Sequence, residues 1–241
     1  MSDKLCLMTG GSRGLGAALV EQYQQQGWTV REFSRSGSGE AHFDADFSRR
    51  ESAIDVIDAE FRAQASQDWD EVVLILNAAQ IGPIGPLPSS APRDWWQSLD
   101  VNLTLNISAA GLFQQHFQHS PARKTLAVIS SGAARMGMGG WSLYCLAKAG
   151  LERLAESIAE EQQNADHPIQ TLSISPGLID TQMQAEIRSS DADNFADVEE
   201  FIAFKEQGAL VDPNRVATAV RQLIDSPFRS GELKSVSEIL S

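Results

Sequence analysis

Tyr144 and Lys148 are four residues apart in a stretch whose residue types predict a helix, so their side chains share one helix face. A tyrosine hydroxyl has a pKa of about 10 in water and becomes a useful proton donor near neutral pH when a nearby cation lowers it. Ser130 and Ser131 lie just upstream and add further hydroxyl groups. Together these residues suit the reduction of a carbonyl group beside a nicotinamide. The alternative is a half-buried tyrosine next to an exposed lysine.

A glycine-rich segment near the N-terminus predicts a binding site for a pyrophosphate. The apolar run Leu5–Met8 is followed by Gly10, Gly14 and Gly16. An amphipathic stretch that begins at Leu15 overlaps the last of these glycines. A strand, a glycine turn and a helix in this order let backbone N–H groups and a helix N-terminus hold phosphates. The spacing G-x-x-x-G-x-G differs from the G-x-G-x-x-G pattern of the longer dehydrogenases. An ordinary turn is the alternative.

The segments that must position these residues alternate between strand-like and helix-like patterns along the chain, which predicts an α/β fold. The strand-like segments are nearly continuous apolar runs, which suit parallel strands buried on both faces, with helices covering each face of the sheet. Nothing divides the chain, so residues 1–241 form one domain, and Gly82–Pro92 is a surface loop. The expected strands are Leu5–Met8, Thr29–Phe33, Val72–Leu76, Leu126–Ile129 and Leu172–Ile174. The expected helices are Leu15–Gln26, Arg50–Ala65, Arg93–Gln118, Ser142–Gln163 and Asp212–Asp225.

Composition and charge narrow the class of protein. A chain of 241 residues can bury one sizeable core, and its net charge of −13 argues against nucleic acid or an anionic membrane as a partner. The sequence shows neither a membrane-spanning run nor a signal-peptide pattern, which predicts a cytoplasmic protein. Two cysteines, Cys6 and Cys145, fit a reducing compartment. The four histidines lack metal-ligand spacing, so no metal is expected.

Several short motifs occur in a fixed order along the chain. They are Thr9–Gly16, Asn77-Ala78-Ala79, Asn102, Ser131 at 13 residues before Tyr144, Pro176-Gly177 and Thr181. With these motifs the chain resembles the short-chain dehydrogenase/reductase family over nearly its whole length. The third position of Asn77-Ala78-Ala79 departs from the family, which has glycine there. The resemblance implies a single-domain Rossmann-type, doubly wound parallel sheet and an oxidoreductase with a nicotinamide cofactor.

The resemblance also implies roles for individual residues. Tyr144 donates the proton, Ser131 donates a hydrogen bond to the same carbonyl oxygen, Lys148 lowers the tyrosine pKa and holds the ribose, and Asn102 positions the lysine through a water. The alternatives are that Ser131 or, better, Ser130 caps backbone, and that Asn102 bonds within its helix. The implied cofactor-binding residues are Gly10, Ser12, Arg13, Gly14, Leu15, Gly16, Arg35, Asp46, Phe47, Asn77, Ala78, Tyr144, Lys148, Pro176, Gly177, Ile179 and Thr181.

Charge near the second strand predicts which nicotinamide cofactor is bound. NAD sites of this type place an acid at the end of that strand, where this chain has Ser34. Arg35 follows, and Arg13 lies in the glycine segment, so two guanidinium groups suit the 2′-phosphate of NADP. The alternative is that both arginines are solvated and that Glu32 binds the ribose.

A narrower resemblance links the chain to the sepiapterin reductase branch, which includes bacterial reductases of benzil. It rests on the segments Gly140–Cys145, Pro176–Gln184, Lys205–Asp212 and Ser230-Gly231. Sepiapterin reductases place an aspartate shortly after the last of these segments, where it anchors the pterin ring. This chain has no aspartate there, which favours an aromatic ketone or 1,2-diketone over sepiapterin as the substrate. A 3-oxoacyl thioester is a further candidate substrate. A non-catalytic NADP-binding regulatory protein is the alternative class, and the intact Ser131, Tyr144, Lys148 and Asn102 set argues against it.

Two further expectations concern the surface. Ser189–Glu200 is the most polar stretch, which indicates a solvated, mobile face. It falls where the family carries a flap, so residues of about 185–210 are expected to form a lid over the substrate. Trp141, Met136, Met138 and Met183 are expected to line the substrate side or to be plain core. The family's interface helices correspond to Arg93–Gln118 and Ser142–Gln163, so a homodimer or a tetramer is expected.

Overall fold

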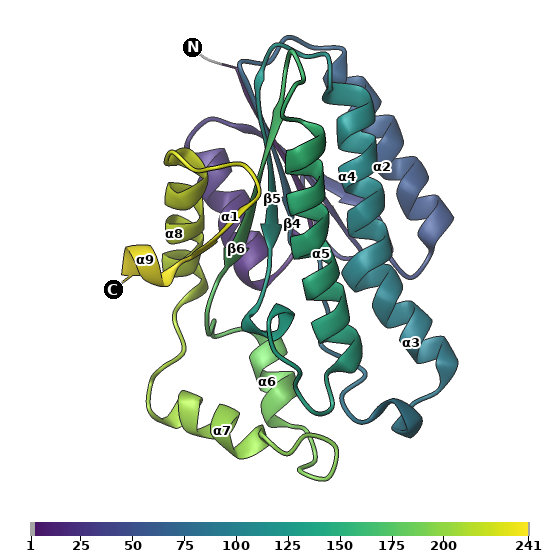
Figure 1. The fold of residues 1–241 in the computed structure, drawn as a ribbon, viewed down its shortest axis with the longest axis vertical. Coiled ribbons are helices and arrows are strands. Elements are labelled where there is room, and N and C mark those ends of the chain that lie inside the picture. Colours follow the sequence, from purple (N-terminus) through teal and green to yellow (C-terminus); the bar gives the residue numbers. More distant parts are fainter. Residues whose placement is uncertain (1–2, 241) are drawn as a thin grey trace.

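The computed structural model describes residues 3–240 as one α/β domain built on a seven-stranded, all-parallel sheet (Figure 1). The strand order is β3-β2-β1-β4-β5-β6-β7, so the sheet grows outward in both directions from β1 and β4. This reversal of order places a crevice at the carboxyl ends of the central strands. The strands are β1 Lys4–Thr9, β2 Thr29–Ser34, β3 His42–Asp44, β4 Glu71–Leu76, β5 Arg123–Ile129, β6 Ile169–Ser175 and β7 Glu232–Ser235.

Helices cover both faces of the sheet, with α2, α4 and α5 on one face and α1 and α8 on the other (Figure 1). The α-helices of the described residues are α1 Gly14–Gln25, α2 Arg50–Ala65, α3 Pro92–Leu99, α4 Leu105–Phe117, α5 Ser142–Glu161, α6 Gln182–Arg188, α7 Val198–Glu206, α8 Pro213–Asp225 and α9 Ser237–Leu240. Within residues 3–240, none of the helices has the length and apolarity to cross a bilayer, and no three His, Cys, Asp or Glu side chains are grouped as metal ligands.

Alternation along β1 shows how the sequence specifies two cores. Leu5 and Leu7 point to the face of α2, α4 and α5, whereas Cys6 and Met8 point to the face of α1 and α8. Successive side chains of a strand point to opposite faces, so a continuous apolar run supplies both layers. The expected doubly wound fold is therefore confirmed.

Differences from the predicted elements lie at the edges of the sheet, in one long helix, and in the helices α6, α7 and α9, which were not predicted. The strands β3 and β7 were not predicted, because short, polar edge strands such as Glu232–Ser235 lack the apolar run that marks a central strand. The predicted helix Arg93–Gln118 consists of α3 and α4 joined by a π-helical turn over Asp100–Thr104. A π-helical turn adds a residue to the helical repeat, and such turns are frequent at functional sites.

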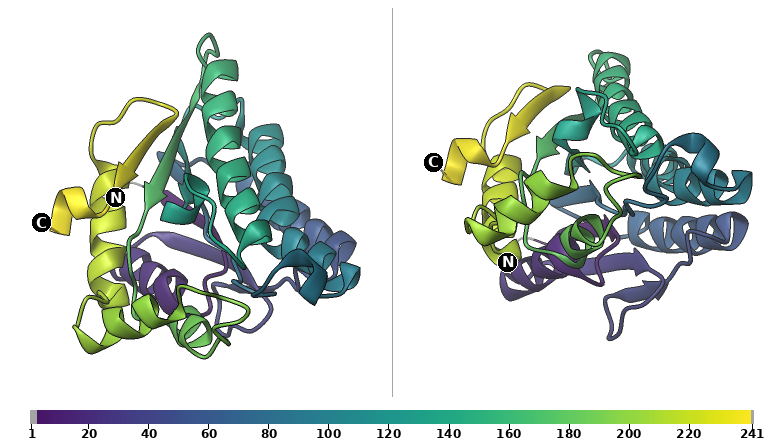
Figure 2. Two further views of the ribbon diagram at one scale, coloured as in Figure 1. Left: turned by 60° about the horizontal axis from the view of Figure 1, so that its bottom comes forward. Right: turned by 90° about the horizontal axis from the view of Figure 1, so that it is seen from below.

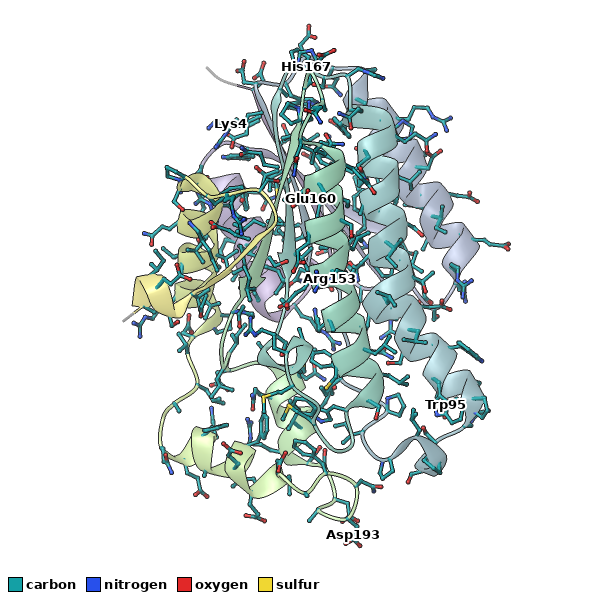
Figure 3. All side chains as sticks on the ribbon, in the orientation of Figure 1. Lys4, Trp95, Arg153, Glu160, His167 and Asp193 are labelled. Carbon is teal, nitrogen blue, oxygen red and sulfur yellow. The ribbon has the colours of Figure 1, made fainter. Side chains whose placement is uncertain are left out.

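The segment after β6 folds over the carboxyl ends of the strands as α6, a loop and α7 (Figure 2). Figure 3 places Asp193 on this loop, at the end of the molecule farthest from His167. Most residues of 189–200 are exposed, in line with the predicted solvated face, but Phe195 and Val198 are buried, as is Phe201 just beyond the segment. Their apolar side chains are spaced among acidic residues and hold the segment down, which the high charge of the stretch obscures.

Candidate active site

A cavity of about 520 Å³ opens at the carboxyl ends of the central strands. Its walls come from the glycine segment, the ends of β2 and β4, the segment after β5, the start of α5, and the segment from β6 into α6. All 17 of the predicted cofactor-binding residues line it, Tyr144 and Lys148 among them, as does Ser131. The fold thus brings residues from position 10 to position 181 to one cleft.

The glycine segment forms one wall by turning sharply into α1. Gly10 and Gly14 have positive φ angles of 73° and 55°, a region that other residues rarely adopt. A Cβ at Gly16 would lie 2.0 Å from the Gly10 carbonyl oxygen, so only glycine fits there. The start of α1 has no side-chain cap among the described residues, and its first N–H groups suit an anion. This wall fits the pyrophosphate of a dinucleotide.

A buried polar network holds the glycine segment against β4, and sequence reasoning missed most of it. The Asn77 amide donates to the Gly10 carbonyl at 2.8 Å, so this side chain holds the turn. The Thr9 hydroxyl accepts from the backbone N–H groups of Asn77 and Ala78 and donates to Asn106 at 2.9 Å. The only signal for Asn106 was its position four residues after Asn102, on the same helix face.

The far end of the cavity is lined by Ser34, Arg35, Asp46 and Phe47. Partial burial acts to raise the pKa of Asp46, but hydrogen bonds from Ser48 and the nearby Arg35 charge hold that pKa below its ordinary value. Asp46 therefore stays ionised and can accept hydrogen bonds from a base or sugar.

Glu32, the alternative ribose ligand, is buried behind this wall. Its carboxylate accepts from the Gly11 N–H at 3.1 Å and from the Ser34 hydroxyl at 3.2 Å, and it lies 2.5 Å from His42 Nδ1. It does not line the main cavity. Its oxygen atoms are occupied within the protein. Arg35, just after the end of β2, and Arg13 of the glycine segment line the cavity as cationic side chains.

Ser131, Tyr144 and Lys148 meet in the middle of the cavity. Ser131 follows the end of β5, and Tyr144 and Lys148 lie in the first two turns of α5. The Ser131 hydroxyl also accepts from the Ala133 N–H at 3.2 Å, so Ser131 caps the short turn after it. The expectation that Ser130 takes the capping role is wrong, because the Ser130 hydroxyl donates to the carboxylate of Glu152 instead.

The pKa values of the pair differ from the expected ones. Burial raises the pKa of Tyr144 to about 12, and a side-chain hydrogen bond with Ser131 opposes that rise. Burial also lowers the pKa of Lys148 to about 8, opposed by the charge of Glu152. The Lys148 ammonium donates to the Ile129 carbonyl at 2.7 Å and lies 5.7 Å from the Tyr144 ring centroid. In this arrangement Tyr144 is a neutral donor at pH 7, because the effect of burial on its pKa outweighs that of the Ser131 hydrogen bond, and the expected lowering by Lys148 is not found.

Asn102 lies beneath the cavity and is absent from its lining. Its side-chain oxygen accepts from the Gln80 N–H at 2.7 Å, and its amide donates to the Gln80 carbonyl at 2.9 Å and to Ser98 at 3.2 Å. The π-helical turn brings this side chain to the loop after β4. Asn102 therefore anchors that loop as well as bonding within its own helix.

Aromatic and thioether side chains form the outer part of the cavity. Trp141, Met138, Met183 and Phe201 line it, whereas the fourth residue expected there, Met136, is 61% exposed and lies outside it. Trp141 stacks on the buried Phe195 ring at 4.8 Å and nearly parallel, and it packs edge-on against Tyr144 at 5.8 Å. The outer cavity is thus an aromatic chamber next to the reacting hydroxyl groups.

A doubly wound sheet, a glycine loop at its switch point and a Ser-Tyr-Lys group in one cavity define a nicotinamide-dependent oxidoreductase. Residues 4–192 match the family model described as short chain dehydrogenase. The chain belongs to the short-chain dehydrogenase/reductase family, whose members use NAD or NADP.

Named relatives and solved structures agree with this assignment. The chain is 31% identical over 98% of its length to all of a benzil reductase ((S)-benzoin forming) of Bacillus subtilis. It is 27% identical to a sepiapterin reductase of Meriones unguiculatus, with 94% of each chain covered. A short-chain dehydrogenase/reductase from Saccharomyces cerevisiae has the same fold, with a TM-score of 0.81, 22% identity and 97% and 96% of the two chains covered. The chain is thus a carbonyl oxidoreductase acting on a small molecule.

Proposed function

We propose that this protein is an NADPH-dependent reductase that converts an aromatic ketone or a 1,2-diketone such as benzil to the alcohol. The observation that carries the proposal is the aromatic chamber of Trp141 and Phe201 in the same cavity as Ser131, Tyr144 and Lys148. A flat aromatic substrate can stack there while its carbonyl oxygen reaches the hydroxyl groups. The similarity to the benzil reductases supports the same substrate class.

Each residue of the site has a defined task in this mechanism. Bound NADPH supplies a hydride to the carbonyl carbon. The Ser131 and Tyr144 hydroxyl groups both hydrogen-bond the carbonyl oxygen, and Tyr144 gives it a proton as negative charge develops. Lys148 holds the ribose hydroxyl groups with its ammonium, and Asn102 fixes the loop of Gln80 beneath the substrate. Burial keeps water away from these groups, which strengthens their electrostatic interactions.

The choice of NADP over NAD rests on the adenosine end of the cavity. Arg35 lines that end and Arg13 lines the cavity from the glycine segment, and both suit the dianionic 2′-phosphate, whereas Glu32 is occupied by Gly11, Ser34 and His42. Arg35→Ala should weaken NADPH binding by at least about tenfold, or 1.4 kcal/mol, and leave NADH binding nearly unchanged. Fluorescence titration of both nucleotides measures this, and an equal loss for both would contradict the preference.

The test of the function is NADPH consumption by the purified protein with benzil, isatin, sepiapterin and an acetoacetyl thioester. We expect turnover of the aromatic diketones with NADPH, and a fall of about 10²–10⁴-fold in Tyr144→Phe. If sepiapterin alone were turned over, the protein would be a pterin reductase, the alternative function that the similarity to a sepiapterin reductase supports. Full activity of Tyr144→Phe would overturn the mechanism.

We propose that residues of about 185–210 form a lid over the substrate. The support is that α6 and α7 lie over the carboxyl ends of the strands (Figure 2) and contribute Ile187 and Phe201 to the cavity lining. Apolar contacts of Phe195, Val198 and Phe201 hold them there. A lid of this kind excludes water once substrate is bound. Hydrogen exchange with and without NADPH and benzil tests it, since the lid should gain protection that α8 does not.

A homodimer, or a tetramer built from it, is our proposal for the assembly. The helices α3, α4 and α5 present the large apolar side chains of Trp96, Ile107 and Leu146, which are 62%, 42% and 53% exposed. Exposed apolar groups along neighbouring helices suit a second copy of the chain. Light scattering should give a multiple of 26.2 kDa, and Ile107→Glu should reduce it.

We propose a cytoplasmic location. Its support is that the structure leaves Cys6 and Cys145 as free thiols, as expected in a reducing compartment. Fractionation of the source cells would test it, and recovery outside the cytoplasm would contradict it.

A further inference from the structure

Glu152 on α5 is a partly buried carboxylate that the reaction steps above do not use. One of its oxygen atoms accepts a hydrogen bond from the buried hydroxyl of Ser130. A guanidinium nitrogen of Arg135 lies 3.8 Å from the same oxygen. Ser130 precedes Ser131, and Arg135 ends the short turn that Ser131 begins. The carboxylate therefore contacts the chain on both sides of Ser131.

Lys148 makes the adjoining contact between the same two elements. Its ammonium donates to the carbonyl of Ile129, the last residue of β5, at 2.7 Å. Glu152 is one helical turn beyond Lys148, so both side chains leave the same face of α5. Two successive turns of α5 thus bind two successive residues, Ile129 and Ser130, immediately before Ser131.

Charge adds a second effect to this geometry. The charged and titratable groups that face Lys148 are Tyr144 and Glu152 of its own helix, and Arg135 faces the carboxylate from the loop after β5. Burial lowers the pKa of Lys148, and Glu152 acts in the opposite direction. An anion within the same buried region offsets part of the cost of placing the ammonium there.

We propose that Glu152 is a positioning residue for the reaction, which ties the segment of Ser131 to the helix of Tyr144 and Lys148 and supplies a counter-charge to the Lys148 ammonium. The inference rests on the proposed function, in which Ser131 and Tyr144 act on one oxygen atom. That joint action requires β5 and α5 to keep a fixed separation, because misplacement by about 1 Å can cost on the order of 10²-fold in rate.

Three variants separate the two effects. Glu152→Gln keeps an acceptor for the Ser130 hydroxyl but removes the charge. We expect its kcat/KM at pH 6 to stay within about threefold of that of the unchanged protein. In the pH profile, the limb where activity falls with rising pH should move to a pH about one unit lower. Ser130→Ala should lower kcat by about tenfold without moving that limb. Glu152→Ala should show both effects.

Glu156→Gln is the matched control, since it removes the same charge from the next turn of α5. Glu156 pairs with Arg153 at the surface of that helix, and Figure 3 labels Arg153 there. This variant should leave both the rate and the pH profile unchanged. A Glu152→Gln profile that coincides with that of the unchanged protein, or a Glu156→Gln profile that shifts equally, would overturn the proposal.

A readout that needs no turnover distinguishes failure of this proposal from failure of the proposed function. The pH at which Lys148 loses its proton can be followed through protein stability, by comparing each protein with its Lys148→Met derivative. The transition should lie about one unit lower in the Glu152→Gln background than in the unchanged one. An unshifted transition would refute the role of Glu152 even if benzil is not a substrate, and a shifted one would support it in the same case.

Discussion

Replacing Lys148 by methionine isolates the energetic cost of the buried ammonium. Burial lowers the pKa of this lysine from its ordinary value of 10.5 to about 8 in the folded protein. Between these two pH values the unfolded chain holds more protons than the folded one, so the free energy of unfolding rises with pH. The difference of about 2.5 in pKa corresponds to about 3–4 kcal/mol, since each pH unit is worth about 1.4 kcal/mol. Methionine has a similar length and does not titrate.

The measured quantity is the free energy of unfolding of the unchanged protein minus that of Lys148→Met, without nucleotide and at one protein concentration. We expect this difference to be constant below about pH 8, to rise by about 3–4 kcal/mol between pH 8 and 10.5, and to be constant above. Urea titrations at intervals of half a pH unit resolve such a rise. The lost hydrogen bond to Ile129 lowers the variant's stability by a constant amount and does not alter the shape of the curve.

Ser131→Ala is the control, because its hydroxyl does not ionise in this range and its difference curve should be flat. A flat curve for Lys148→Met would refute the reasoning, since it would mean that the lysine has the same pKa in the folded and unfolded chains. A curve that falls with pH would mean that the fold stabilises the ammonium, the opposite of what its burial implies.

Two other substitutions test the walls of the cavity. Gly16→Ala should weaken NADPH binding by more than about tenfold, because its Cβ would lie 2.0 Å from the Gly10 carbonyl oxygen; a fluorescence titration that gives an unchanged dissociation constant would contradict this. Phe195→Ala should raise the KM for benzil by about tenfold and leave the dissociation constant of NADPH within about twofold, because it removes the ring stacked on Trp141 at 4.8 Å. Equal effects on both ligands would argue against a lid role.

The central part of the fold could be predicted because its strands are buried on both faces. A run such as Val72–Leu76 is typical of a buried parallel strand, and the observed strand differs from the predicted one by a single residue. The edge strands and the helices over the cavity carry no such signal. Phe195 is fully buried within an acidic segment, and its tertiary contacts with Trp141 and Phe201 account for that burial.

The cavity lining was largely predictable, whereas the groups that support it were not. Glycine spacing and the Tyr144 to Lys148 interval are local patterns, so they are visible in the sequence directly. The contacts of Asn102 with Gln80 and of Ser130 with Glu152 join residues 22 positions apart. No periodicity connects such pairs, because they depend on the π-helical turn and on the packing of α5 against β5.

Lys148 and the π-helical turn at Asn102 depart from the local rules for a buried position and a regular helix. A buried ammonium costs stability, and a π-helical turn interrupts the regular helix between α3 and α4. Elsewhere on α5 the buried positions are apolar residues such as Leu151, Ala155 and Ile158, which only pack. Folding alone would favour an apolar residue at position 148 as well. That the chain places a lysine there, with a carboxylate one turn away to offset its charge, argues that the ammonium serves the chemistry of the cavity.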